Sequence, residues 1–273
     1  MKKNTERNRP RREDAHFGQN ALVFEGIVSL RALLEGGRRP IEKVLVTRGR
    51  AAKNSRELGF LKAKAAERGF ALEITDDDSV ERLATGNTHG GLLALCGEYS
   101  LPDRLPDDIG RGFFVLLDGV EDPYNFGYAL RSLYAAGADC VLLPPRSWMS
   151  AAGIVCRASA GASERLTLCA CESADAVTEL KARGFSIVCA DIDDSVPVYD
   201  AALKLPLLLI VGGEKRGISR PLREAADAVV RLDYGRPFDA ALSAASAASI
   251  LAFEVFRQNR EILCADPGRV SLP

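Results

Sequence analysis

Three segments of this 273-residue chain combine turn residues with side chains that could take part in chemistry. The first, DGVEDPYNFGYALRS, starts at Asp118 and carries Asn125 and Arg131. The second, GGEKRG, covers residues 212–217, and the third, DYGRPFDAALS, covers residues 233–243. A helix N-terminus beside a guanidinium suits a phosphate group or a developing oxyanion. Arg131 is therefore the first candidate for stabilising negative charge.

The surroundings of Arg131 also allow a plainer interpretation. Asn125 and Gly127 should mark the start of a helix, and Arg131 should lie one turn further along it. An ion pair between Arg131 and Asp118 or Asp122 would then occupy the guanidinium. Spacing alone leaves both interpretations open.

The glycine-rich segment 212–217 does not match the common phosphate-binding loops. It has neither GxGxxG spacing nor the GxxxxGK[ST] pattern, which disfavours a nucleoside triphosphate site. Its glycines would still let a ligand approach the backbone closely, although a plain strand-to-helix turn gives the same composition. His89, in the turn THGG, is expected to have a structural role or a polar contact at the surface.

Each of the three segments follows an apolar run that predicts a strand. The runs are FFVLL (113–117), LPLLLIV (205–211) and AVVRLD (228–233). Helices are expected over residues 125–137, 150–166, 173–184, 219–226 and 241–258. Continuous apolar strands are typical of parallel sheets covered on both faces, and ligands bind beyond the carboxyl ends of such strands. We therefore predict an α/β fold with a mostly parallel sheet that brings the three segments to one edge.

The composition changes along the chain predict two domains. Residues 21–97 alternate strands and helices and should form a small α/β domain, which begins with a helix over residues 25–37. Residues 98–110 carry two prolines and four acids and read as a linker. The predicted divisions are a basic tail over 1–20, the small domain over 21–97, the linker over 98–110, the larger domain over 111–260 and a C-terminal tail over 261–273.

Composition limits the other classes of function. The net charge of −1 means that nucleic-acid binding must come from a local patch. The seven cysteines form no CxxC pair and the chain has two histidines, so we expect reduced, mostly buried thiols and no metal site. No run approaches the ~20 apolar residues of a membrane span, and we expect a cytoplasmic protein without membrane contact.

The segments also resemble those of a known family. LDGVEDPYNFGYALRS is similar to the first motif of the SpoU (TrmH-like) RNA 2′-O-ribose methyltransferases of the SPOUT superfamily. RASAGA (Arg157–Ala162) and LLLIVGGEKRGIS (Leu207–Ser219) resemble the following segments in the same order, and ALSAASAASILAFEVFRQ takes the place of the third motif. FEGIVSLRALLE and THGGLLAL are similar to the beginning and end of the RNA-substrate-binding domain that many members carry.

The resemblance implies a fold, a cofactor and a site. It implies a trefoil knot at the C-terminal end of the fold, S-adenosylmethionine as methyl donor, and a homodimer whose active site uses both subunits. By motif position, the donor would contact Gly212, Leu232 and Leu242. Arg131 takes the place of the catalytic arginine, and Asn125, Glu214 and Ser243 occupy the other characteristic polar positions.

The third motif departs from the family pattern. The family usually reads Ser-Leu-Asn where this chain reads Ala241-Leu242-Ser243. A serine hydroxyl is shorter than an asparagine amide and lacks its paired donor and acceptor. We therefore keep three hypotheses: a methyltransferase acting on the ribose of rRNA or tRNA, a catalytically weakened relative that binds RNA, and a generic α/β enzyme for another small ligand.

The basic residues of the N-terminal third should grip the RNA mainly through phosphates. The candidates are Lys2, Lys3, Arg7, Arg9, Arg11, Arg12, Arg38 and Arg39.

Overall fold

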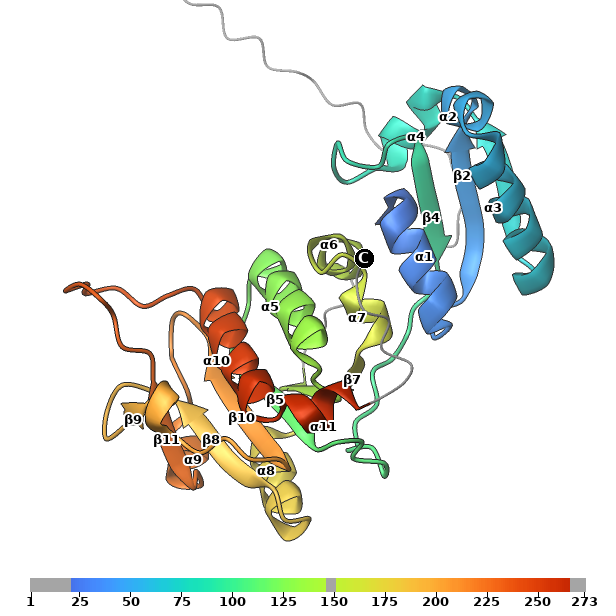
Figure 1. The fold of residues 1–273 in the computed structure, drawn as a ribbon. Helices are drawn as coiled ribbons and strands as arrows, with labels where there is room; N and C mark the ends of the chain where they lie inside the picture. Colours follow the sequence, from blue (N-terminus) through green and yellow to red (C-terminus); the bar gives the residue numbers. More distant parts are fainter. Residues whose placement is uncertain (1–20, 146–150, 266–273) are drawn as a thin grey trace, which may run out of the picture.

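The computed structural model describes residues 21–145 and 151–265, which form two sheets (Figure 1). The predicted basic tail over residues 1–20 lies outside the described residues, and so does the last part of the predicted C-terminal tail, residues 266–273. We call residues 21–97 the N-terminal unit and the described residues from 111 to 265 the C-terminal unit.

The N-terminal unit is built on a mixed sheet with the strand order β1-β4-β2-β3. Its strands are β1 (Leu22–Glu25), β2 (Ile41–Thr47), β3 (Ala71–Thr75) and β4 (Leu92–Cys96). Its helices are α1 (Gly26–Gly36), α2 (Arg48–Lys53), α3 (Ser55–Arg68) and α4 (Asp77–Leu83). Strand β2 runs parallel to β3, whereas β4 is antiparallel to both β1 and β2. The sequence did not predict β1 or α2, because each is short and continues directly into or out of a predicted element.

The C-terminal unit contains a seven-stranded sheet in the order β7-β6-β5-β10-β8-β11-β9, and every neighbouring pair is parallel. Its strands are β5 (Phe113–Asp118), β6 (Cys140–Leu143), β7 (Thr167–Ala170), β8 (Ser186–Ala190), β9 (Val196–Pro197), β10 (Leu207–Gly212) and β11 (Ala228–Arg231). This arrangement confirms the predicted α/β fold with a mostly parallel sheet.

Helices cover both faces of this sheet, as the continuous apolar strands require. Helices α5 (Pro123–Ala136) and α10 (Ala244–Gln258) lie side by side on one face. Helices α8 (Ser173–Ala182) and α9 (Arg220–Glu224) cover the other. Strand β5 contributes side chains to the cores on both faces of the sheet, because side chains alternate along a strand. Phe113 and Val115 pack in the core with α5 and α10, whereas Phe114 and Leu116 pack with α8 and α9.

The helix predicted over residues 150–166 is wrong. Its described part contains two short helices, α6 (Ala152–Ala158) and α7 (Ala162–Arg165). Between them Ala160 has φ 50° and Gly161 has φ 84°, and a right-handed helix cannot continue through left-handed backbone. The last helix of the described residues is α11 (Arg260–Cys264). A 3₁₀ turn, η2 (Val198–Asp200), precedes β10.

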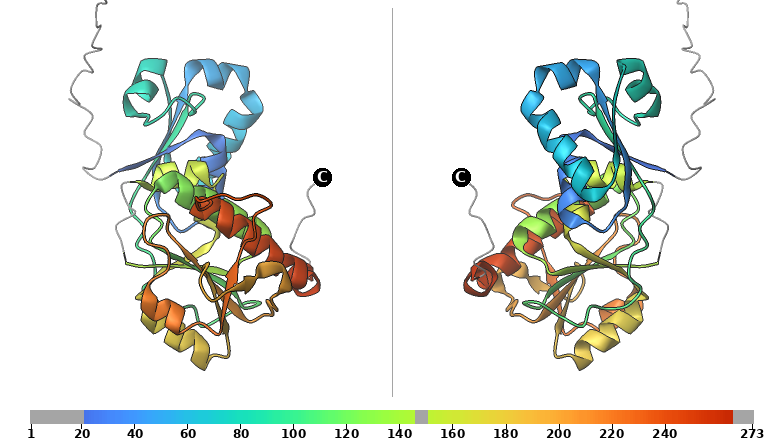
Figure 2. Two further views of the ribbon diagram at one scale, coloured as in Figure 1. Left: turned by 90° about the vertical axis from the view of Figure 1, so that its left-hand side faces the viewer. Right: turned by 90° about the vertical axis from the view of Figure 1, so that its right-hand side faces the viewer.

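Helices α6 and α7 also form the contact between the two units. Helix α6 packs against β1, and α7 packs against α1 (Figures 1 and 2). No helix or strand lies between Cys96 and Phe113, the part of the chain that was predicted as a linker. The domain boundaries at residues 98–110 and the trefoil knot stay predictions.

Within the described ranges, no helix is both long and apolar enough to span a membrane. Six of the seven cysteines are buried free thiols, as predicted, and Cys264 is exposed. Burial raises the pKa of the Cys156 and Cys189 thiols to about 12, so these thiols are protonated and unreactive at neutral pH.

Candidate functional site

The carboxyl ends of β5 and β10 bring the first two candidate segments together. Gly212 pairs with Asp118 in the last register position of these two strands. The Gly213 amide then donates to the Asp118 carbonyl at 2.7 Å, and the Ser219 amide donates to the Asp118 carboxylate at 3.0 Å. Asp118 thus closes the glycine-rich loop onto the loop that follows β5.

The glycines at this edge allow backbone to pack directly on backbone. A Cβ atom at Gly212 would lie 2.4 Å from the carbonyl carbon of Gly217, and one at Gly213 would lie 2.1 Å from the carbonyl oxygen of Gly119. Neither position has room for a side chain, because contacts below 3.0 Å are essentially never seen for Cβ atoms. These glycines therefore fix the shape of the edge itself.

Glu214 joins the beginnings of two helices at this edge. Its Oε1 atom accepts a hydrogen bond from Asn125 Nδ2 at 2.9 Å and a second from the Ala244 amide at 3.1 Å. Asn125 lies in the first turn of α5, and Ala244 is the first residue of α10. A carboxylate is well placed at helix N-termini, where backbone amides lack intrahelical partners. Two of the predicted polar site residues, Asn125 and Glu214, are thus in direct contact.

Ser243 lies beside this junction as the N-cap of α10. Its Oγ accepts from the Ser246 amide at 3.2 Å and lies 3.0 Å from the Ser246 hydroxyl. An N-cap serine satisfies one of the free amides of the first turn. The hydroxyl that replaces the family's asparagine therefore starts the helix in this chain.

The three residues predicted to contact the methyl donor lie on the same edge of the sheet. Gly212 ends β10, and Leu232 follows β11, which is separated from β10 by β8. Leu242 precedes α10, two residues before the Ala244 amide that contacts Glu214. Leu232 and Leu242 are both half-buried, and Leu232 packs against the core. Half-buried apolar side chains beside exposed turn backbone suit a nucleoside such as the adenosine of S-adenosylmethionine.

Tyr234 is a residue at this edge that sequence analysis missed. Its hydroxyl accepts a hydrogen bond from the Leu242 amide at 3.2 Å, and its ring lies 6.0 Å from that of Phe238. Both rings are exposed. An aromatic residue in a turn-rich segment gives no signal that it braces a loop eight residues away.

Arg131 lies further along α5 than predicted. The helix begins at Pro123 with Asp122 as its N-cap, so Arg131 follows Pro123 by eight residues and lies more than two turns in. Asp122 uses its carboxylate to accept from the Asn125 amide at 2.8 Å. Neither Asp118 nor Asp122 pairs with Arg131, and within residues 21–145 and 151–265 its exposed guanidinium has no hydrogen bond or ion pair. The ion-pair alternative is therefore wrong for the described chain.

Arg131 is also separated from the Glu214 junction. It follows Asn125 by six residues, which places it about 9 Å further along the axis and roughly 120° around the helix. The structure thus brings Asn125, Glu214 and Ser243 together but leaves Arg131 on the outer face of α5.

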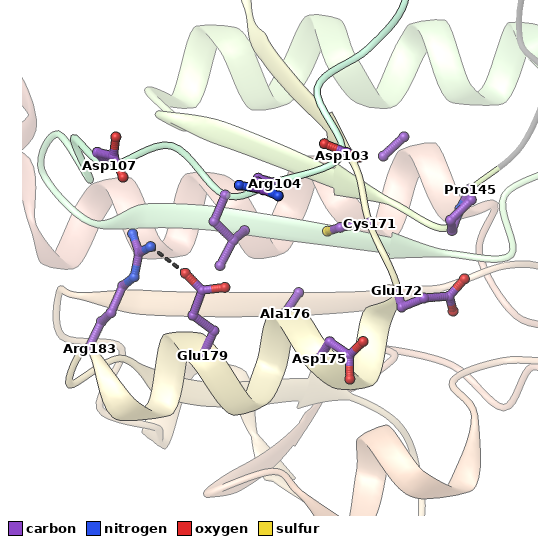
Figure 3. A pocket seen from close by; sticks show the side chains of 12 residues that line it. Asp103, Arg104, Asp107, Pro145, Cys171, Glu172, Asp175, Ala176, Glu179 and Arg183 are labelled. Atoms are coloured by element: carbon purple, nitrogen blue, oxygen red, sulfur yellow. Dashed lines mark hydrogen bonds and ion pairs between the residues drawn. The ribbon is translucent and has the colours of Figure 1, made fainter.

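Two cavities lie beside the carboxyl ends of β6 and β7. The first, of about 490 Å³, lies between the segment around Asp103 and helix α8, and it is lined mainly by charged side chains (Figure 3). The second, of about 350 Å³, lies where the two units meet and includes Arg39 and Glu164 in its wall. None of the residues predicted for catalysis or donor binding lines either cavity, whereas Arg38 and Arg39, predicted to contact RNA, line the second. Among the described residues, no group of three His, Cys, Asp or Glu side chains is arranged to hold a metal ion.

Comparison with known families gives two matches along the chain. Residues 112–253 match the SpoU rRNA methylase family, and residues 23–102 match the RNA 2′-O ribose methyltransferase substrate-binding family. The methylase match alone covers more than half of the 273 residues. The two matches fall on the C-terminal and N-terminal units respectively.

Individual proteins show the same likeness. A protein of Staphylococcus haemolyticus named as a TrmH family tRNA/rRNA methyltransferase is 29% identical, over 72% of this chain and 82% of its own length. A crystal structure of an RNA 2′-O ribose methyltransferase superposes with a TM-score of 0.73 at 25% identity, over 89% of this chain and 90% of that one. The AdoMet-bound rRNA methyltransferase of Sinorhizobium meliloti shares the fold with a TM-score of 0.72 at 23% identity, over 87% of both chains.

The strand order, the order of the three segments at the carboxyl edge and these matches agree, and the chain belongs to the SpoU rRNA methylase family.

Proposed function

We propose that this protein transfers a methyl group from S-adenosylmethionine to a ribose 2′-hydroxyl of rRNA or tRNA. The observation that carries the proposal is the junction of Asn125, Glu214 and the start of α10 in a chain that matches the methylase family over residues 112–253. The named activities of the relatives point to the same chemistry. When bound, S-adenosylmethionine supplies an activated methyl group on a sulfonium.

The residues proposed to hold the donor are Gly212, Leu232 and Leu242. Their backbone groups can bond the polar edge of an adenine, and the two leucine side chains can cover its apolar faces. The Asp118 and Glu214 hydrogen bonds fix the loops that carry Gly212 and Leu242. Alignment of two reactants by such rigid loops can lower a barrier by ~7–11 kcal/mol in favourable cases.

Arg131 is proposed to stabilise the negative charge that develops on the ribose oxygen and to anchor a nearby phosphate. A guanidinium is a poor proton acceptor because its pKa exceeds ~12, so charge stabilisation is its natural role. The absence of a partner for Arg131 among the described residues supports this role, since no ion pair within residues 21–145 and 151–265 neutralises its charge.

The distance of Arg131 from the Glu214 junction supports a homodimer in which each site uses both subunits. The outer faces of α5 and α10 carry exposed apolar side chains next to Arg131. These are Tyr124, Tyr128 and Tyr134 on α5 and Ile250 and Phe253 on α10. Contiguous exposed apolar surface often marks a protein–protein interface. A second copy of the chain on this face would bury it and bring Arg131 to the partner's donor-binding edge.

RNA is proposed to bind across both units, in the cytoplasm. Arg38 and Arg39, two of the predicted phosphate contacts, are turned inward: Arg38 donates to the Leu166 carbonyl, and Arg39 pairs with Glu164 at 3.4 Å. The other predicted contacts lie outside the described residues. Exposed cations at the start of α2 and on α3, such as Arg48 and Arg56, are the better candidates for phosphate contact.

The decisive experiment is a labelled-methyl transfer assay on total RNA from a strain that lacks the protein. Label in RNA, mapped by mass spectrometry to a ribose 2′-oxygen, is the expected result. Donor and RNA binding without transfer would instead support the weakened RNA-binding relative, which the Ala241-Leu242-Ser243 sequence favours. Calorimetry that detects no donor binding would favour an enzyme for another small ligand and would overturn the proposal.

A further inference from the structure

Glu25 is a buried carboxylate at the boundary between the two units. It ends β1 and precedes α1, yet its side chain does not cap that helix. Only 4% of the residue is exposed. Its Oε1 atom accepts from the Thr85 amide at 2.7 Å, the Thr85 hydroxyl at 2.8 Å and the Gly86 amide at 2.8 Å. Glu25 therefore holds one end of the loop Thr85–Gly91, which contains the THGG turn.

The other carboxylate oxygen of Glu25 binds an arginine from the C-terminal unit. Arg157 Nη1 lies 2.5 Å from Glu25 Oε2 and also donates to the Thr88 hydroxyl at 3.1 Å. A Cβ atom at Gly86 would lie only 2.3 Å from Arg157 Nη1. The arginine of the RASAGA segment thus lies directly beneath the loop and leaves no space between them.

The far end of the loop is fixed from within the N-terminal unit. The Thr47 amide donates to the Gly91 carbonyl at 2.9 Å, and Arg50 donates to the Gly90 carbonyl at 2.5 Å. Arg50 is itself held by two hydrogen bonds to Glu57, at 2.7 and 2.9 Å. In the middle of the loop Thr85–Gly91, Asn87 and Thr88 are exposed. The result is a rigid polar loop beside α2 whose position depends on both units.

The packing of α6 on β1, next to the Glu25–Arg157 pair, restricts movement of the two units relative to each other. A Cβ atom at Gly153 of α6 would lie 2.0 Å from the Val23 carbonyl oxygen of β1. A second ion pair, Arg165 with Glu35 at 2.7 Å, bridges the same units, but the Glu35 side chain is 58% exposed whereas that of Glu25 is 3% exposed. Ion pairs with an exposed partner contribute little to stability. Removing Arg157 should therefore disturb the contact between the two units much more than removing Arg165.

We propose that Arg157 is a positioning residue for the RNA substrate, which acts through Glu25 to hold the loop Thr85–Gly91 in a fixed place relative to the methyl-transfer edge. The inference rests on the proposed function, because it assigns the loop to the RNA-binding surface. The exposed hydroxyl of Thr88 and the exposed amide of Asn87 suit the phosphates and 2′-hydroxyls by which proteins bind folded RNA.

The test compares Arg157→Ala with Arg165→Ala, a matched variant in which the lost arginine also bridges the two units and has the same 24% side-chain exposure. We expect Arg157→Ala to raise the KM for RNA about tenfold with little change in kcat or in donor affinity, and Arg165→Ala to change KM less than twofold. Arg157→Lys should recover part of the loss, since an ammonium can still pair with Glu25.

A second readout does not depend on activity. Hydrogen exchange at the Thr85 and Gly86 amides should accelerate in Arg157→Ala and not in Arg165→Ala. The double variant Glu25→Gln/Arg157→Ala guards against misfolding, because the glutamine oxygen can still accept from those amides and no buried charge is left unpaired. It should fold and still show the raised KM.

Two outcomes overturn the inference. Equal effects of Arg157→Ala and Arg165→Ala on exchange would show that Arg157 does not hold the loop. Faster exchange with an unchanged KM would show that the loop does not contact RNA. A wild-type protein that methylates no RNA would defeat the proposed function, yet the exchange experiment would still decide whether Arg157 holds the loop.

Discussion

Glu214 links Asn125 to the start of α10 through a single oxygen atom. That atom accepts from Asn125 and from the Ala244 amide, and Ser243 caps the same helix start. Each of these contacts is local, but together they fix where α5 and α10 begin at the carboxyl edge. Changes to single side chains at this edge should therefore affect stability and donor binding together.

Replacing Glu214 with alanine should lower stability by about 1–2 kcal/mol, because the Ala244 backbone amide and the Asn125 side-chain amide lose their acceptor. Thermal denaturation should show a decrease of several degrees, and calorimetry should show weaker donor binding. Glu214→Gln retains an acceptor oxygen and should lie close to wild type in both measurements. Equal losses in the two variants would mean that charge, and not the hydrogen bonds, matters at this position.

In contrast to Glu214→Ala, Arg131→Ala should reduce the rate of methyl transfer but leave stability almost unchanged. Its exposed side chain has no partner among the described residues, so unfolding free energy should change by less than ~0.5 kcal/mol. If it stabilises the developing oxyanion, kcat should fall by about 10²–10³. Single-turnover rates and melting curves on the same preparation check both parts, and an undiminished rate would exclude Arg131 from the chemistry.

Glu25 should make stability depend on acid pH. Burial raises the pKa of this carboxyl, but the hydrogen bonds from Thr85 and Gly86 and the charge of Arg157 outweigh it and hold the pKa below the ordinary 4.5. The stabilisation is therefore complete above about pH 4.5 and is lost as pH falls through the lower folded-state pKa. The difference in unfolding free energy between wild type and Glu25→Gln should shrink in this window when followed by denaturant titration at several pH values. A constant difference would contradict the assignment.

At the scale of elements, the boundaries of α5 determine where the proposed site residues Asn125 and Arg131 lie. Asp122 caps the helix by accepting from the Asn125 amide, and Pro123 occupies its first turn. Both are common at helix starts. The helix therefore begins two residues before Asn125, which had been predicted as its start, and this is why Arg131 lies further along than expected.

Removing this cap should loosen the start of α5. Asp122→Ala is expected to cost about 1 kcal/mol, whereas Asp122→Ser keeps a capping oxygen and should cost only a few tenths. Because Asn125 lies in the affected turn, the alanine variant should also weaken donor binding, which calorimetry can measure. A loss of stability with unchanged donor affinity would show that the first turn of α5 does not contribute to donor binding.

At the scale of the whole molecule, the outer faces of α5 and α10 form the proposed dimer interface. We expect Phe253→Glu to convert a dimer to a monomer, because a charge would replace an exposed apolar side chain at the centre of the proposed interface. Sedimentation velocity can detect the change, and methyl transfer should be lost with it if the site uses both subunits. Val28, also exposed but on α1, offers a control: Val28→Glu should leave the sedimentation coefficient unchanged.

The sequence predicted the parallel sheet and the neighbourhood of the first two segments because apolar runs and strand-end loops are local signals. Motif position also singled out Asn125 and Glu214, whose side chains the structure brings into contact, while their role in the site stays a prediction. The sequence could not reveal that Arg157 reaches Glu25, since the two residues are 132 positions apart and an arginine in a predicted helix gives no indication of its partner. The break at Ala160 and Gly161 was missed because small residues at helical spacing are compatible with one continuous helix.

The contact of Gly153 with the Val23 carbonyl has a consequence for protein engineering. Fusions and chimaeras usually treat the two halves of such a chain as exchangeable modules. Here a replacement N-terminal unit would have to present a backbone that packs directly on Gly153, and it would also have to supply a carboxylate for Arg157. Chimaeras that combine units from distant relatives should therefore misassemble, unless α6 and β1 come from the same parent protein.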